Sequence, residues 1–231
     1  MVPFANRIAH GRFQFEGRTV QISRNWSGDA HPLHGEGWHA PWSVTGGSTS
    51  GATLRFEGGG GEWPWRYDCE QHFQLLQDEL SIELAIRNLG NTPMPAMLGL
   101  HPYFCDPASA HLSATLPRVW LTNEAALPVE EVPTPIAWDF ERGRVVNAIP
   151  LDHCFSGWDG HARLRWPDRC VTVRASGCHA LQIYAPAGKD FFCLEPQSAA
   201  SGALGRDREE FAVIAPGERS AIGVRFSVGT T

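Results

Sequence analysis

The sequence lacks any run of Lys or Arg, and its 231 residues carry a net charge of −6 with a pI near 5.9. Nucleic-acid binding needs a basic surface that neutralises phosphates, so these values argue against it. The chain also lacks an apolar stretch of the roughly twenty residues that span a bilayer, and residues 1–7 do not have the shape of a signal peptide. We therefore expect a soluble cytoplasmic protein that binds neither nucleic acid nor membrane.

Paired cysteine motifs are absent as well. The sequence contains no Cys-x-x-Cys, and the cysteine spacing does not indicate a zinc knuckle. In a cytoplasmic chain, isolated cysteines are expected to be buried free thiols. This expectation applies to all six cysteines, which are Cys69, Cys105, Cys154, Cys170, Cys178 and Cys193.

Helical periodicity is scarce, whereas alternation with period two dominates the chain. Only Asp207 to Phe211 is compatible with a helical turn. The clearest alternation places Leu80, Ile82, Leu84 and Ile86 on one face, and similar patterns recur at Phe13/Phe15, Val171/Val173, Leu181/Ile183 and Ile222/Val224. Antiparallel sheets with one solvated face produce this pattern. We predict an all-β antiparallel sandwich that forms a single domain over residues 1–231.

Two short segments carry the most informative side chains. One is Gly99-Leu100-His101-Pro102 and the other is Cys193-Leu194-Glu195-Pro196. In each, a titratable residue follows an apolar run and precedes a proline, which cannot donate to a strand ladder. We therefore expect both strands to end there and to present His101 and Glu195 at a cleft, where they could act as an acid and a base.

A glycine-rich loop adds three histidines, His31, His34 and His39. His34 and His39 with His101 and Glu195 could instead form a His/carboxylate metal site of the kind found in cupins. Cupins usually place two ligand histidines one residue apart, and this sequence has no His-x-His. We therefore expect neither a metal nor a cofactor.

Four segments together resemble the aldose 1-epimerase (galactose mutarotase-like) family. They are Asn6-Arg7-Ile8 followed by His34-Gly35, the stretch from Asn88 to Phe104, Leu151 to Phe155, and Leu194 to Gln197. They occur in the family's order and with comparable spacing, so the resemblance covers nearly the whole chain. It implies a galactose mutarotase-like supersandwich and an isomerase of carbohydrate metabolism.

The resemblance also implies roles for individual residues. In such enzymes the anomeric O1–H loses a proton while the ring oxygen O5 gains one, and the ring opens and recloses. By this resemblance Glu195 is the base and His101 the acid, while Arg7, His34 and Asp152 bind the sugar. The expected partner is a small free hexose, and the reaction requires no cofactor.

Family members usually have several tens of residues before the Asn-Arg segment, so we expect this sandwich to lack N-terminal strands. Two other functions remain as alternatives. A non-catalytic carbohydrate-binding module is compatible with the nine tryptophans, since Trp rings stack on sugars. A hexose-6-phosphate mutarotase needs further cations at the pocket rim, for which Arg24, Arg66 and Arg206 are candidates.

Overall fold

The computed structural model describes residues 1–206 and 210–231. Most of these residues lie in β-strands, and the strand pairings of the described residues are all antiparallel. The helical elements among them are short 3-10 turns: η1 (Ala9–Gly11), η2 (Glu36–Trp38), η3 (Ile136–Trp138), η4 (Val146–Ala148) and η5 (Ala203–Gly205). Across the two described ranges, no helix is long and apolar enough to cross a membrane. The helical turn expected at Asp207–Phe211 falls largely on residues outside these ranges.

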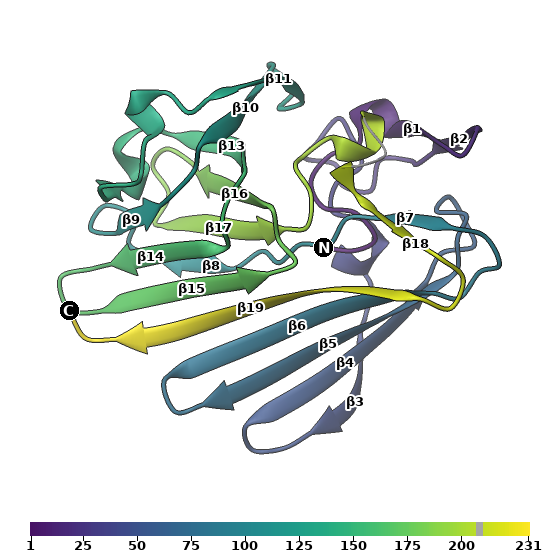
Figure 1. The fold of residues 1–231 in the computed structure, drawn as a ribbon, viewed down its shortest axis with the longest axis horizontal. Coiled ribbons are helices and arrows are strands. Elements are labelled where there is room, and N and C mark those ends of the chain that lie inside the picture. Colours follow the sequence, from purple (N-terminus) through teal and green to yellow (C-terminus); the bar gives the residue numbers. More distant parts are fainter. Residues whose placement is uncertain (207–209) are drawn as a thin grey trace.

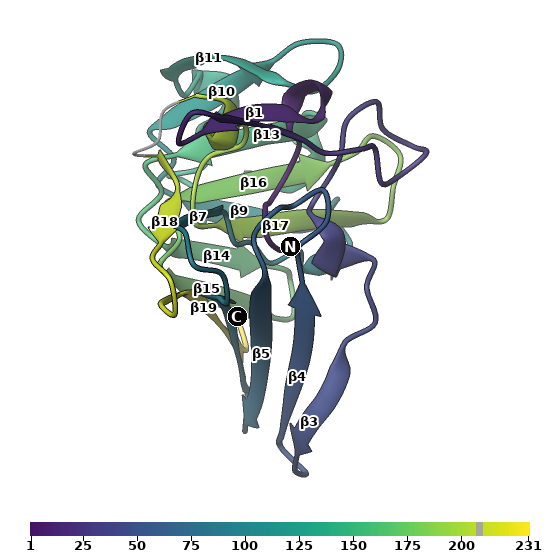
Figure 2. The same cartoon turned by 90° about the vertical axis from the view of Figure 1, so that its right-hand side faces the viewer.

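A nine-stranded sheet forms the larger layer of the molecule (Figure 1). Its strands, in spatial order, are β12 (Arg144–Val145), β9 (His111–Ala114), β14 (His161–Arg165), β15 (Cys170–Ser176), β19 (Arg219–Gly229), β6 (Glu79–Asn88), β5 (Tyr67–Leu76), β4 (Gly51–Gly58) and β3 (Ser43–Gly47). The β3–β5 end of this sheet extends away from the second layer (Figure 2).

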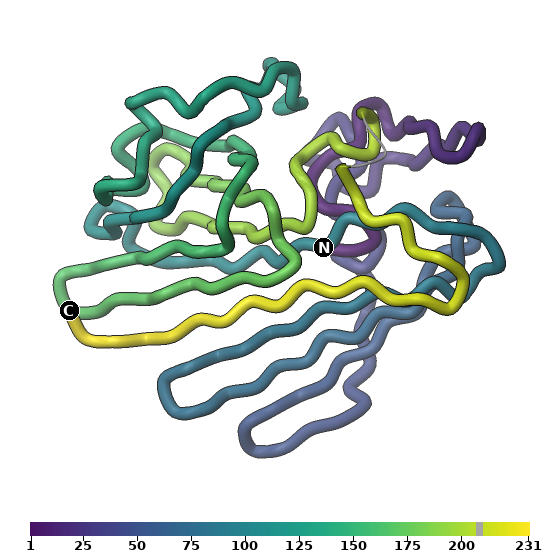
Figure 3. Tube along the Cα trace, viewed as in Figure 1, coloured from purple at the N-terminus to yellow at the C-terminus, as the bar shows by residue number. Residues whose placement is uncertain are grey.

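A six-stranded sheet forms the second layer. Its order is β11 (Pro128–Pro133), β10 (Arg118–Thr122), β13 (Leu151–Ser156), β16 (Ala180–Ala185), β17 (Phe191–Gln197) and β8 (Tyr103–Cys105). Two small pairs complete the fold, the hairpin β1 (Arg12–Phe15) with β2 (Arg18–Gln21), and β7 (Met94–Ala96) with β18 (Ala212–Ile214). The chain begins between the two layers, as its trace shows (Figure 3).

The predicted all-β antiparallel sandwich is confirmed, and the alternating residues account for its core. Leu84, Val173 and Ile222 from the large sheet are almost fully buried in the same cluster as Phe155 and Ile183 from the smaller one. Ile82 and Val171 are partly buried and pack against this cluster. Burying one apolar face of each sheet against the other removes that surface from water and stabilises the two layers.

The predicted ends of the two strands before proline are wrong. Strand β17 continues through Pro196, which lies opposite Leu181, and its carbonyl accepts a hydrogen bond from the Leu100 N–H. The N–H and C=O positions of one strand residue point to the same side, so the missing donor of Pro196 faces the Leu100 segment and leaves the β16 ladder intact. His101 lies in the loop between β7 and β8 instead of at a strand end.

The cysteines are free thiols, as expected, but they are not all buried. Cys69, Cys154, Cys170, Cys178 and Cys193 are buried, whereas Cys105 is exposed. Cys105 lies on β8, the edge strand of the six-stranded sheet, and edge strands have one side open to solvent.

Candidate functional site

Neighbouring strands of the six-stranded sheet bring three polar side chains to one face. Gln182 on β16 lies directly opposite Glu195 on β17 and opposite Cys154 on β13. Asp152 is two residues from Cys154 and therefore points to the same face, because side chains on a strand alternate. Sequence alternation had placed Gln182 on the solvated face, but it is 3% exposed.

Loops supply the opposite wall of the site. An isolated bridge between Gly99 and Gln197 holds the His101 loop beside β17, and a second bridge pairs Arg7 with Leu33, next to His34. These elements enclose a cavity of about 400 Å³. Its lining includes Arg7, His34, His101, Asp152 and Glu195, the five residues named from the sequence.

His101 and Glu195 lie in direct contact. The His101 Nε2 atom is 3.2 Å from the Glu195 Oε1 atom, and the carboxylate is 3% exposed. Burial and, to a smaller extent, the negative charge of the nearby Asp152 raise the pKa of Glu195 to about 8. Burial lowers the pKa of His101 to about 4. The pair therefore holds one proton between about pH 4 and pH 8.

His34 lies beside this pair, with its ring centroid 5.4 Å from that of His101. Its Nδ1 atom accepts a hydrogen bond from the Asn6 backbone N–H at 3.1 Å, which assigns the proton of the neutral ring to Nε2. Burial, reinforced by His101, lowers the pKa of His34 to about 2. His34 is thus a neutral hydrogen-bond donor at physiological pH.

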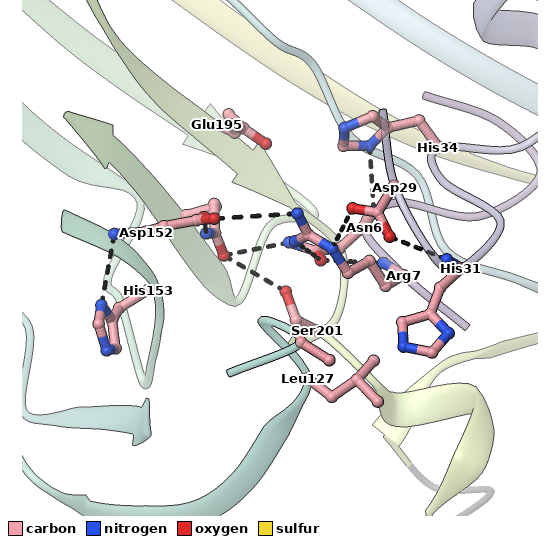
Figure 4. A network of polar contacts seen from close by, with 12 residues as sticks. Asn6, Arg7, Asp29, His31, His34, Leu127, Asp152, His153, Glu195 and Ser201 are labelled. Atoms are coloured by element: carbon pink, nitrogen blue, oxygen red, sulfur yellow. Dashed lines mark hydrogen bonds and ion pairs between the residues drawn. The ribbon is translucent and has the colours of Figure 1, made fainter. Parts of the chain in front are cut away.

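Arg7 and Asp152 belong to a polar network that crosses the floor of the cavity (Figure 4). The Arg7 Nε atom donates to Asp29 at 2.7 Å, and its terminal nitrogen lies 3.9 Å from Asp152. Gln182 donates to Asp152 at 2.6 Å and accepts from the Asn6 side chain at 3.2 Å. These contacts fix the orientation of groups that can bind hydroxyls.

Sequence reasoning did not include Asn6, Asp29 or Gln182 among the site residues. Asn6 and His34 both have a left-handed backbone, with φ of 61° and 58°, a conformation that costs energy and clusters at functional sites. Asn is among the residues that tolerate this conformation, but a single Asn in a sequence does not reveal it. Gln182 could have been found only from its register opposite Glu195.

Aromatic side chains form the rim. Trp26 and Trp38 are 45% and 38% exposed and line the cavity, and the ring of Tyr103 stacks on His101 at a centroid distance of 4.9 Å. Such rings can contact the C–H faces of a sugar while the polar groups bind its hydroxyls.

Three potential metal ligands also converge here, since the candidate ligand atoms of His34, His101 and Glu195 lie within 4.8 Å of one another. A His₂Glu set is chemically suited to zinc. The Nε2 atom of His34 is the nitrogen left for a metal, because Nδ1 already accepts the Asn6 N–H. His101 and Glu195 have the alternative of sharing a proton, which a metal would displace.

The family model for aldose 1-epimerases matches residues 1–227, and the chain belongs to this family. The uncharacterized protein YphB of Escherichia coli K12 is 32% identical over 94% of this chain and 79% of its own length.

Solved structures show the same fold. A crystal structure from E. coli K12, named "putative aldose 1-epimerase", matches with a TM-score of 0.94 and 30% identity over 100% of this chain and 82% of that one. A galactose mutarotase-like protein from Clostridium acetobutylicum matches with a TM-score of 0.86 and 18% identity over 98% of this chain and 78% of that one. These likenesses confirm the galactose mutarotase-like fold.

Proposed function

We propose that this protein is an aldose 1-epimerase that interconverts the α and β anomers of a free hexose. The observation that carries the proposal is the buried contact between His101 and Glu195 inside a cavity lined by hydroxyl-binding groups. A carbohydrate-binding module needs such a lining, but it does not need an acid and a base that share one proton.

Mutarotation needs one group that gives a proton and one that takes a proton, and a pair that shares a single proton supplies both. A neutral His101 with a protonated Glu195 has the same composition as an imidazolium with a carboxylate, so moving one proton across 3.2 Å produces the reactive form. Glu195 then takes the O1 proton while His101 gives its proton to O5, and the C1–O5 bond breaks. Rotation about C1–C2 and the reverse transfers reclose the ring as either anomer.

The other groups hold the sugar during these steps. The Nε2–H of His34 is available to donate to O5 and to stabilise charge that develops there. The guanidinium of Arg7 donates to hydroxyl oxygens, and Asp152 accepts from hydroxyls. Each acid or base in such a reaction contributes roughly 10²–10⁴-fold to the rate.

The lining favours a free sugar over a sugar phosphate. Arg24, Arg66 and Arg206 are absent from the described lining of this cavity, where Arg7 is the one Arg or Lys side chain. Arg206 lines a neighbouring cavity of about 220 Å³ instead. The further cations that a phosphate site needs therefore have no source among the described lining residues.

Polarimetry of freshly dissolved α-glucose and α-galactose tests the proposal. We expect the wild-type protein to accelerate anomer exchange, and Glu195→Gln to reduce the catalysed rate roughly 10²-fold or more while sugar binding changes much less. His101→Asn should behave similarly. Glu130→Gln removes an exposed carboxylate on β11 and serves as the matched control.

Two outcomes separate the alternatives. Sugar binding without any acceleration by the wild-type protein would support the binding module and overturn the enzyme. Loss of activity on treatment with a chelator, restored by a divalent metal, would support the metal site formed by His34, His101 and Glu195.

A further inference from the structure

Arg7 enters the cavity already paired with an acid that the proposed reaction does not use. Its Nε atom donates to Asp29 Oδ2 at 2.7 Å, and Asp29 Oδ1 accepts the His31 backbone N–H at 2.9 Å. Figure 4 shows the guanidinium between the carboxylates of Asp29 and Asp152. Both carboxylate oxygens of Asp29 are thus held in place, one by Arg7 and the other by the backbone of its own loop.

The two carboxylates differ in how strongly they act on Arg7. The Asp152 side chain is 36% exposed and lies 3.9 Å from the guanidinium, so water screens its charge. The Asp29 side chain is 9% exposed and in direct contact, so its charge is screened much less. Asp29 is therefore the main group that cancels the positive charge of Arg7.

The remaining charges of the described lining do not restore a positive potential. Burial keeps His34 neutral by lowering its pKa, and His101 and Glu195 share a single proton. With one guanidinium and two aspartates, the floor carries a net negative charge. Binding a phosphate or carboxylate there costs the desolvation free energy of the anion, and the described lining offers no cation without a carboxylate partner to offset that cost.

We propose that Asp29 is a specificity-determining residue, which holds Arg7 in place for binding hydroxyls and makes the cavity reject anionic hexoses. This inference rests on the proposed function of the same site. The probes are glucose, glucose 6-phosphate and glucuronate, of which the last two carry a negative charge at C6. Removing the Asp29 charge leaves Arg7 without its direct anionic partner, so the guanidinium can pair with an oxyanion of the ligand instead.

The test compares the wild-type protein with Asp29→Asn, and with Asp168→Asn as the matched control. Asp168 also pairs with an arginine, Arg169 at 2.9 Å, but on the surface at 73% exposure. Anomer exchange of the three probes is followed by NMR, and binding of glucose 6-phosphate by ³¹P line broadening. We expect Asp29→Asn to raise the ratio of kcat/KM for anionic over neutral sugar roughly tenfold or more. The control should leave this ratio unchanged, and Asp29→Glu should keep the wild-type preference.

Asp29→Ser provides a second neutral variant if Asp29→Asn does not fold, because a hydroxyl can still accept the His31 N–H. A neutral variant that loses glucose turnover with no gain in binding of glucose 6-phosphate would show that Asp29 is only a structural support. A wild-type protein that binds glucose 6-phosphate as tightly as glucose also overturns the inference, whichever variants fold. Failure of the proposed function gives a different result from failure of this inference. In that case the wild-type protein turns over none of the three sugars, while the ³¹P measurement still reports whether Asp29 controls anion binding.

Discussion

At the scale of single residues, the decisive contact is that between His101 and Glu195. Burial disfavours charge on both side chains, so the pKa of the Glu195 carboxyl lies above its ordinary value and the pKa of the His101 imidazole lies below its own. Each residue alone would be poorly suited to its task at neutral pH. Together they retain one proton across this range, which provides one group to give a proton and one to take it.

The pH dependence of kcat/KM should follow from this shared proton. Below about pH 4 the pair gains a second proton and lacks a base, and above about pH 8 it loses its proton and lacks an acid. We expect a bell-shaped profile that falls on both sides of these values. Polarimetry in phosphate-free buffers, corrected for the spontaneous rate, measures it. A profile that stays flat across both limits would contradict the assignment.

The same burial predicts how Glu195→Gln changes stability. The native carboxyl keeps its proton up to about pH 8, whereas the unfolded one loses it near pH 4.5, so folding takes up a proton in between. The contribution of Glu195 to stability therefore falls as pH rises from about 4.5 to 8 and then levels off. The glutamine side chain does not titrate, so between pH 5 and pH 8 the variant should gain stability relative to the wild-type protein on the order of a few kcal/mol. Denaturant unfolding at pH 5 and pH 8.5 checks this, and equal effects of the substitution at both values would refute it.

At the scale of elements, the loop from Leu33 to Gly35 positions His34 through its backbone. Gly35 has φ of 75°, and a Cβ atom there would lie 2.2 Å from the Val2 carbonyl oxygen. Gly17 in the β1–β2 turn has a similar φ of 76°, but nothing lies within 4 Å of its Cβ position. Alanine substitutions at the two positions therefore distinguish the cost of backbone strain alone from the cost of strain together with steric overlap.

We expect Gly17→Ala to cost about 1 kcal/mol, which is the strain of a left-handed alanine. Gly35→Ala should cost at least about 2 kcal/mol more, because the Val2 segment must move. Gly35→Ala should also reduce the rate of anomer exchange, since His34 is its neighbour, whereas Gly17→Ala should leave the rate unchanged. Thermal unfolding and polarimetry measure both effects. Equal losses of stability in the two variants would show that the Val2 segment moves aside without a cost in free energy, which contradicts this prediction.

Strand positions were largely predictable from alternation, whereas the site was predictable only in part. Leu84, Val173 and Ile222 repeat with period two because each faces the other sheet. Alternation predicted a solvent-exposed Gln182, but this side chain is buried, because β16 has the protein core on one side and the cavity on the other. It also failed at Pro196, where the expected strand end depended on which neighbour the missing N–H would face.

Asp29 shows a second limit of sequence reasoning. Nothing in its surroundings in the sequence distinguishes it from other aspartates in polar loops. Its importance comes from contact with Arg7, twenty-two positions earlier in the chain. Long-range pairings of this kind depend on how the loops fold back over the sheet, which periodicity does not encode.

At the scale of the whole molecule, the core cluster contains residues of both sheets, including Leu84 and Val224 from one and Leu181 and Leu194 from the other. We therefore propose that residues 1–231 form one domain. Because the two layers share this core, loss of packing in one should destabilise the other.

Leu84→Ala tests this by removing a side chain that is 1% exposed. It should lower the free energy of unfolding by roughly 2–5 kcal/mol and leave a single transition. Far-UV circular dichroism and tryptophan fluorescence should give the same midpoint in the wild-type protein and in the variant. Two separate transitions would indicate layers that unfold independently.

The division of the site between a sheet and its loops has a consequence for engineering. Glu195, Gln182 and Asp152 are spaced by a hydrogen-bonded ladder, whose geometry a few substitutions cannot change. Trp26, Asp29, His34 and Trp38 lie within one short stretch of chain that packs over this ladder. Exchanging residues 23–38 as a cassette, with His34 retained, therefore offers a route to new sugar preferences, because Glu195 and His101 lie outside this stretch and stay in place.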